Sequence, residues 1–223
     1  AVAVARLRQA GAGLIGLTNM TEYAFSGLGL NPHWGTPPSA KADGRIPGGS
    51  TSGGAVSVAR GIADVALGTD TGGSTRIPAA FNGIVGSKPT SHRVPTQGAF
   101  PLSYALDSIG PLAASVALCA ATDAVLAGQP PRALRPVALT GLRVGVPRGL
   151  LFEATDPMVA DAFEAALAKL SSLGALVRPF SIDDLLLPMR ASLADGVGFG
   201  EAFDRRPVGV DGGVGEPGHV NGS

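Results

Sequence analysis

Residues 47–78 read PGGSTSGGAVSVARGIADVALGTDTGGSTRIP and hold two serines in glycine-rich turns. Ser50 lies in GGSTSGG, and Ser74 lies in DTGGSTR, 24 positions further along. Between them, the apolar segment 53–62 predicts a buried helix, and segment 64–69 predicts a strand. Ser74 would then follow the carboxyl end of a strand, where α/β folds place their sites.

Helices and short apolar strands alternate on both sides of this stretch. A long loop is expected at 27–49, where glycines and prolines are frequent. The pattern predicts further helices at 2–10, 77–82, 114–127 and 156–174, and strands at 13–17, 83–87, 142–147 and 175–180. In the last helix, Asp156 is the expected N-cap, Pro157 the first helical residue and Gly174 the C-terminal cap. The alternation predicts an α/β core with a largely buried sheet, and residues 142–180 read as a βαβ unit.

Composition excludes several classes of protein. Of the 223 residues, 45% are hydrophobic and 15% are charged, which is typical of a globular chain. The formal net charge is zero, so neither nucleic acid nor a membrane surface is expected as a direct partner. No apolar run reaches the length of a transmembrane helix. The single cysteine, Cys119, reads as a buried apolar residue and favours a reducing, cytoplasmic location.

Other motifs are poor matches to their functions. GAGLIG at 11–16 has the spacing of a dinucleotide fingerprint, but a helix precedes it and a strand would follow, so its glycines read as a helix-ending turn. GGSTSGG lacks the lysine of a phosphate loop. The three histidines, His33, His92 and His219, have no metal-ligand spacing. The sequence therefore predicts neither a cofactor nor a metal.

Two interpretations of the serines stay open at this point. Both serines could simply be turn and cap residues. However, Gly72 and Gly73 immediately precede Ser74 and would let backbone N–H groups converge as an oxyanion hole requires, with Asp70 and Arg76 bracing the turn as an ion pair. These features favour a nucleophilic role for Ser74.

A serine nucleophile needs a base, and no histidine lies between residues 34 and 91. A relay from serine through a second serine to a neutral lysine is the coherent alternative. The chain has only Lys41, Lys88 and Lys169. Lys88 is near in sequence, but its place between a strand and a proline favours a solvated or structural role.

Over residues 1–128 the sequence resembles the amidase signature family. The motifs occur in the family's order: LIGLTNMTEYAFSG, NPHWGTP, RIPGGSTSGGAVSVARG, ALGTDTGGSTRIPAAFNGIVGSKPT and LDSIGPLA. Residues 137–196 are similar to the family's continuation. The resemblance implies an α/β fold with a mixed sheet core covered by helices, and hydrolysis of a small-molecule amide by a Ser–cis-Ser–Lys triad.

The resemblance also implies roles for individual residues. Ser74 matches the nucleophile that becomes acylated, and Ser50 matches the bridging serine on a cis peptide bond. Thr71, Gly72 and Gly73 match the segment whose N–H groups form the oxyanion hole with that of Ser74.

Departures from the family pattern suggest an incomplete chain. None of the three lysines occupies the motif of the catalytic lysine, which is expected before Ala1, and Leu17 stands where many members have a non-catalytic lysine. A partial amidase domain is expected at 1–203, followed by a disordered glycine-rich tail at 204–223. The fragment is therefore expected to be inactive.

Three functional alternatives follow. The main one is an amidase acting on non-peptide carbon–nitrogen bonds, with a homodimer as one possible assembly. The second is the glutamine-hydrolysing component of a tRNA-dependent amidotransferase, which implies partner subunits. The third is a non-catalytic fragment.

Overall fold

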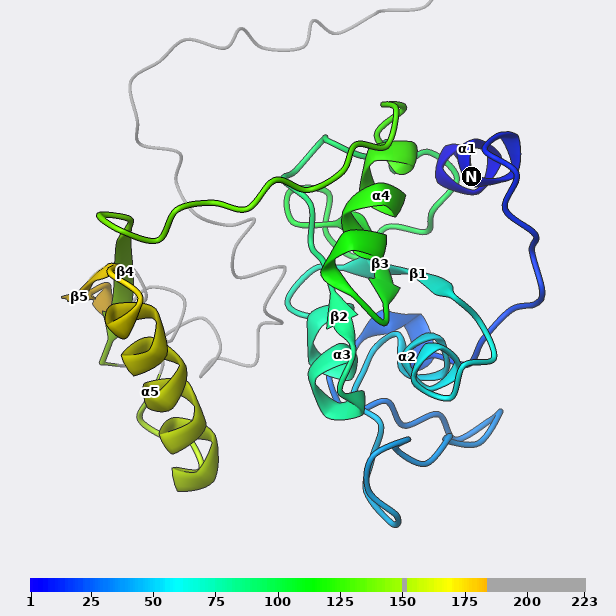
Figure 1. The fold of residues 1–223 in the computed structure, drawn as a ribbon. Coiled ribbons are helices and arrows are strands. Elements are labelled where there is room, and N and C mark those ends of the chain that lie inside the picture. Colours follow the sequence, from blue (N-terminus) through cyan, green and yellow to red (C-terminus); the bar gives the residue numbers. More distant parts are fainter. Residues whose placement is uncertain (150–151, 184–223) are drawn as a thin grey trace, which may run out of the picture.

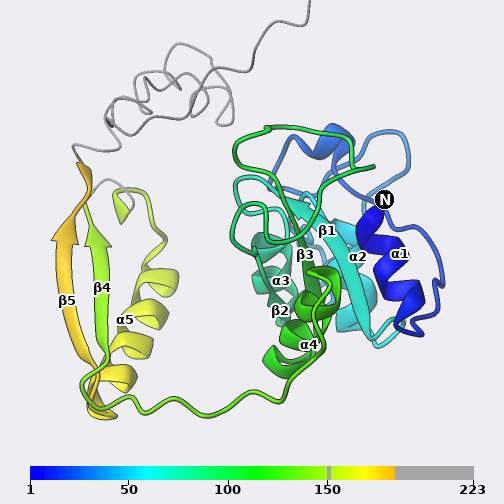
Figure 2. The ribbon, with the colours of Figure 1, turned by 90° about the horizontal axis from the view of Figure 1, so that it is seen from above.

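The computed structural model describes residues 1–149 and 152–183, so the tail expected at 204–223 lies outside the described residues. In Figure 1 the elements from α1 to α4 gather around one sheet, whereas β4, α5 and β5 form a separate unit. Figure 2 shows the same separation, with the segment after α4 running from one unit to the other. Both serines of interest lie in the first unit.

The first unit is built on a three-stranded antiparallel sheet. Its strands are β1 (Val65–Asp70), β2 (Val85–Gly86) and β3 (Ser108–Ala113), in the order β1-β3-β2. β3 is central and all of its residues are buried. This strand is not among the predicted elements, because glycine and proline inside SIGPLA argue against strand structure.

Pro111 fits the central strand because of where β2 ends. The N–H of Ser87 donates to the Pro111 carbonyl at 3.0 Å. Since the nitrogen and carbonyl of a strand residue face the same neighbour, the Pro111 nitrogen faces the end of β2. β2 pairs only through Val85 and Gly86, so the missing N–H falls where the ladder finishes.

Helices cover both faces of this sheet. They are α1 (Val2–Gln9), α2 (Ser52–Ala59), α3 (Arg76–Asn82) and α4 (Val116–Leu126). On one face Leu112 packs with Ala55 of α2 and Ala79 of α3. On the other face Ile109 packs with Ala3 of α1 and Leu126 of α4. Because Ile109 and Leu112 are three positions apart on one strand, they point to opposite faces, which explains why β3 is buried throughout.

The second unit is the predicted βαβ unit. β4 (Arg143–Arg148) and β5 (Leu176–Ser181) are parallel, and α5 (Pro157–Ser172) connects them. Asp156 is the N-cap, with its carboxylate accepting from the Met158 N–H at 2.9 Å, and Gly174 follows the helix with a φ of 96°. The α/β class is confirmed, although within the described residues the parallel and antiparallel pairings occur in separate sheets.

The strand expected at 13–17 is absent, and that prediction is wrong for the structure described. This segment has no regular structure, and Leu14, Ile15 and Leu17 are 60%, 70% and 97% exposed. A strand needs a neighbour for its N–H and C=O groups, and the described residues provide none beside it. A short 3-10 helix, η1 (Glu22–Ala24), follows, and 27–49 is free of helix and strand, as predicted.

Two smaller predictions are also borne out. Gly11 has a φ of 90° and its N–H donates to the Arg8 carbonyl, so it ends α1 as expected. Cys119 is buried, and burial raises the pKa of its thiol, as expected for an apolar role. No helix in the described part of the chain is long and apolar enough to cross a membrane.

Candidate active site

Ser74 lies in the turn that connects β1 to α3 and is 8% exposed. The carboxylate of Asp70, the last residue of β1, organises this turn. It accepts hydrogen bonds from the N–H of Gly73 at 2.7 Å and from the N–H and hydroxyl of Thr75 at 3.1 and 2.7 Å. The Asp70 side chain, which immediately precedes the turn, therefore holds its backbone in place.

The predicted ion pair between Asp70 and Arg76 is present. Arg76 donates through Nε and Nη2 to the two carboxylate oxygens, both at 3.0 Å. The Asp70 side chain is fully buried, and that of Arg76 is 49% exposed. Burial alone would raise the pKa of Asp70, but hydrogen bonds from Arg76 and Thr75 outweigh it and lower this pKa from 3.8 to about 2. Asp70 therefore stays ionised and serves as a structural brace.

The turn leaves three backbone donors free. The N–H of Gly73 is used by Asp70, so this member of the predicted oxyanion segment donates inside the protein. Within residues 1–149 and 152–183, by contrast, the N–H groups of Thr71, Gly72 and Ser74 have no hydrogen-bond partner. Gly73 has a φ of 143°, a conformation that suits glycine. Three N–H groups around a serine are a suitable arrangement for binding an oxyanion.

Ser50 lies in a second turn, which leads into α2. The Gly49–Ser50 peptide bond is cis, in agreement with the family resemblance. The N–H of Gly49 donates to the Gly27 carbonyl at 2.8 Å, and the Ser50 carbonyl accepts from the N–H of Thr21 at 3.0 Å. Residues on both sides of η1 therefore hold the turn around Ser50.

The two serine turns touch each other. The N–H of Thr51 donates to the carbonyl of Ser74 at 3.1 Å, which joins the residue after Ser50 to Ser74 itself. Ser50 is fully buried, and its hydroxyl oxygen has no hydrogen-bond partner within the described residues. Because a buried hydroxyl without a partner costs about 1–3 kcal/mol, the Ser50 hydroxyl is a candidate for a functional role.

None of the three lysines is placed as a base for these serines. The Lys88 ammonium donates to the carbonyls of Asp70 and Leu106, both at 2.5 Å, and to the Ser108 hydroxyl at 3.1 Å. Lys41 and Lys169 are exposed, the latter on α5. Of the solvated and structural roles expected for Lys88, these contacts support the structural one.

Sequence reasoning missed two residues that hold the serine turns. Asn82 at the end of α3 is fully buried; its amide donates to the Pro47 carbonyl at 2.8 Å, and its oxygen accepts from the Ala40 N–H at 2.8 Å. Asp107 accepts from the Thr71 hydroxyl at 2.5 Å. Both act across long sequence separations, so no local pattern could have indicated them.

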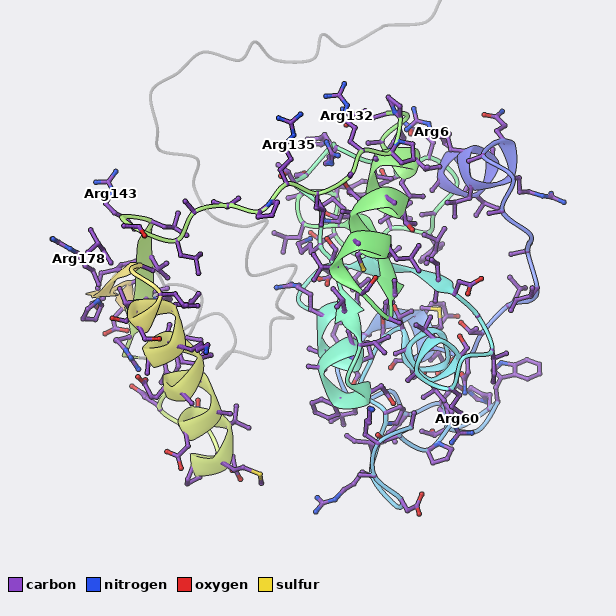
Figure 3. All side chains as sticks on the ribbon, in the orientation of Figure 1. Arg6, Arg60, Arg132, Arg135, Arg143 and Arg178 are labelled. Carbon is purple, nitrogen blue, oxygen red and sulfur yellow. The ribbon has the colours of Figure 1, made fainter. Side chains whose placement is uncertain are left out.

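The described part of the structure offers no metal site. No group of three His, Cys, Asp or Glu side chains there could hold a metal ion. Figure 3 shows the labelled arginines spread over the molecule: Arg60 near the end of α2, Arg143 and Arg178 at the two-stranded sheet, and Arg132 and Arg135 on the connecting segment. Arg6 is bound internally, with Nη1 donating to the Leu126 carbonyl at 2.5 Å.

The fold and the two serines define an α/β protein with a serine-based candidate site. The chain belongs to the Amidase family, whose profile matches residues 1–210, and this confirms the resemblance seen in the motifs. It is 45% identical over 185 residues to 2-amino-5-chloromuconic acid deaminase of Comamonas testosteroni, covering 80% of this chain. It is 43% identical over 195 residues to a glutamyl-tRNA(Gln) amidotransferase subunit of Symbiobacterium thermophilum, covering 82% of this chain.

Solved structures agree with these relatives. A crystal structure of an amidase matches with a TM-score of 0.75 and 44% identity, over 81% of this chain and 41% of the other. The corresponding glutamyl-tRNA(Gln) amidotransferase subunit of Thermotoga maritima matches with a TM-score of 0.76 and 28% identity, over 92% and 50%. The chain spans 40% of the length of each of the two relatives named above, so their whole-protein activities are not transferred to it.

Proposed function

We propose that this chain carries the nucleophile and the oxyanion site of an enzyme that hydrolyses a non-peptide amide bond. The supporting observation is the buried, unpartnered hydroxyl of Ser50 beside the turn of Ser74. A hydroxyl in this position can accept a proton from one group and donate its own to another. Ser50 is thus suited to link Ser74 with a base.

In the proposed reaction Ser74 Oγ attacks the amide carbonyl carbon. Its proton passes to Ser50, and the proton of Ser50 passes to a neutral lysine. The free N–H groups of Thr71, Gly72 and Ser74 would stabilise the negative charge on the carbonyl oxygen. When the carbon–nitrogen bond breaks, the proton returns through Ser50 to the leaving amine or ammonia. Water then hydrolyses the acyl-enzyme and regenerates Ser74.

The lysine of this relay is not one of the chain's own three. Lys88 has all three of its N–H donors engaged, and Lys41 and Lys169 are exposed. We therefore expect the chain alone to hydrolyse amides very slowly or not at all. Ser74-dependent turnover at rates typical of complete amidases would refute this part of the proposal.

Labelling with a fluorophosphonate tests the nucleophile without requiring turnover. Because the base is not among the chain's own lysines, the probe should label wild-type protein at Ser74 slowly by itself and faster once propylamine is added as a base. Ser74→Ala should abolish the label in both cases. The exposed residue Ser91 provides a matched control, because Ser91→Ala should leave labelling unchanged. Labelling that survives Ser74→Ala would overturn the assignment and favour a non-catalytic fragment.

Added propylamine tests the relay. If the missing group is an amine base, propylamine should accelerate labelling of wild-type protein as its neutral form increases with pH. Ser50→Ala should lose most of this acceleration, since the bridging hydroxyl is gone. Equal acceleration in both proteins would contradict the role of Ser50.

A second candidate is the glutamine-hydrolysing component of an amidotransferase. The similarity to glutamyl-tRNA(Gln) amidotransferase subunits supports it, and it implies partner subunits and a charged tRNA held by the assembly. Release of ammonia from glutamine, together with co-purification of partner subunits, would favour this candidate. A preference for other small amides without partners would favour an independent amidase. The chain's single cysteine supports a reducing compartment such as the cytoplasm as part of this proposal.

A further inference from the structure

Lys88 binds the peptide unit that begins the turn of Ser74. Its ammonium donates to the Asp70 carbonyl at 2.5 Å, and its other two bonds go to the Leu106 carbonyl and the Ser108 hydroxyl. An ammonium has three N–H donors, so all of them are engaged. Lys88 therefore ties the last residue of β1 to the segment that enters β3.

Through the trans peptide bond between Asp70 and Thr71, the Lys88 contact also determines the direction of the Thr71 N–H. Among the described residues only the Gly49–Ser50 bond is cis, so the Asp70–Thr71 bond is trans. In a trans peptide the C=O and N–H groups point in opposite directions within one plane. Because Lys88 holds the Asp70 carbonyl, the Thr71 N–H must point away from Lys88. This N–H has no partner in the described part of the chain.

Asp107 holds the same residue through its side chain. One carboxylate oxygen accepts from the Thr71 hydroxyl at 2.5 Å, and the other accepts from the N–H groups of Leu102 and Ser103 at 2.8 and 3.1 Å. The strand register supports both contacts, because Asp70 lies opposite Ser108 where β1 and β3 end and begin. Thr71 is thus fixed by its preceding peptide plane and by its own hydroxyl.

We propose that Lys88 and Asp107 are positioning residues that aim the Thr71 N–H at the oxyanion of the reaction. This inference rests on the proposed function of Ser74. Loss of one oxyanion donor typically slows a reaction about 10²–10³-fold. A small rotation of the Asp70–Thr71 peptide plane would turn the Thr71 N–H away from the oxyanion and cause much of this loss. Neither side chain is assigned contact with the substrate.

The test compares rates of fluorophosphonate labelling at Ser74, because the probe develops negative charge on its phosphoryl oxygen. Lys88→Met keeps an unbranched side chain that is one atom shorter and removes the ammonium with its three donors. It should slow labelling about 100-fold. Lys169→Met, on the exposed face of α5, is the matched control and should label at the wild-type rate. An unchanged rate in Lys88→Met, while Ser74→Ala abolishes labelling, would overturn the inference and leave the proposed function standing.

Two further measurements separate positioning from simple loss of structure. In Lys88→Ala, added ethylammonium should restore part of the labelling rate by occupying the place of the lost ammonium, and thermal unfolding should show a folded protein with and without it. Thr71→Val removes only the hydrogen bond to Asp107 and leaves Lys88 in place. It should slow labelling about tenfold, which is less than the loss of about 100-fold or more expected when an oxyanion donor is removed altogether. A folded Thr71→Val protein with the wild-type rate would refute the role of Asp107. Absence of label in wild-type protein with propylamine present would instead refute the proposed function.

Discussion

Replacement of Asp70 by asparagine tests how the turn of Ser74 is held. The Asp70 carboxylate accepts five hydrogen bonds, from Gly73, Thr75 and Arg76. An asparagine has one acceptor oxygen, and its NH₂ group would face N–H donors that need acceptors. Breaking a buried ion pair by removing one partner costs about 3–5 kcal/mol. The lower end, about 3 kcal/mol, is expected here, because Arg76 is 49% exposed and water can replace its partner.

Urea unfolding followed by far-ultraviolet circular dichroism measures this loss at neutral pH. Glu164→Gln is the matched control: Glu164 pairs with Arg148 on the surface, with side chains 52% and 40% exposed, so its loss should cause no measurable change. If Asp70→Asn unfolds at the same urea concentration as the wild type, the proposed bracing of the turn is wrong.

The pH dependence of the free energy of unfolding tests the same bracing role of Asp70 independently. The folded-state pKa of Asp70, about 2, lies below the ordinary value of 3.8. The ionised carboxylate therefore stabilises the fold fully above pH 3.8, and this contribution is lost as the pH falls through 3.8 towards 2. The difference amounts to about 2 kcal/mol. The stability gap between wild type and Asp70→Asn should narrow by this amount over that range, and a constant gap would contradict the mechanism.

Two other substitutions test the packing around the site. Gly110→Ala would place a Cβ against the Ser87 carbonyl oxygen, closer than van der Waals contact permits, so we expect a loss of more than about 2 kcal/mol and a lower thermal midpoint; an unchanged midpoint would show that β2 can move aside. Asn82→Leu keeps the branched shape of the side chain but leaves the Pro47 carbonyl and the Ala40 N–H without partners, at about 1–3 kcal/mol each. It should also slow fluorophosphonate labelling of Ser74 by shifting the turn of Ser50, and a wild-type rate would argue against this coupling.

Local sequence signals predicted the elements whose ends are marked by their own residues. α5 is the best example, since Asp156, Pro157 and Gly174 act within one turn of the helix ends. The turn of Ser74 was predictable for the same reason: Asp70 and Arg76 are six positions apart, so their ion pair forms within the turn itself. The positions of the glycines likewise indicated where backbone N–H groups would be accessible.

Long-range packing decided what local signals missed. β3 contains Gly110 and Pro111, and it is a strand only because β1 and β2 pair with it and helices cover both of its faces. Conversely, residues 13–17 have the composition of a strand but lack a neighbour among the described residues. Strand structure depends on a partner for its backbone groups, and a short sequence window cannot specify that partner.

The sequence by itself determined the family, the α/β class and the two serine turns, because each is encoded in residues close together in the chain. Only the tertiary structure decided that Thr51 joins the two turns, that Ser50 is buried without a partner among the described residues, and that Lys88 and Asp107 hold Thr71. The contacts of Lys88 and Asp107 join residues 18 and 36 positions apart. The Asp107 contact exists because the antiparallel pairing of β1 with β3 brings the end of one strand to the start of the other. The Lys88 contact also needs β2, because Lys88 follows β2 and β2 pairs with the other edge of β3.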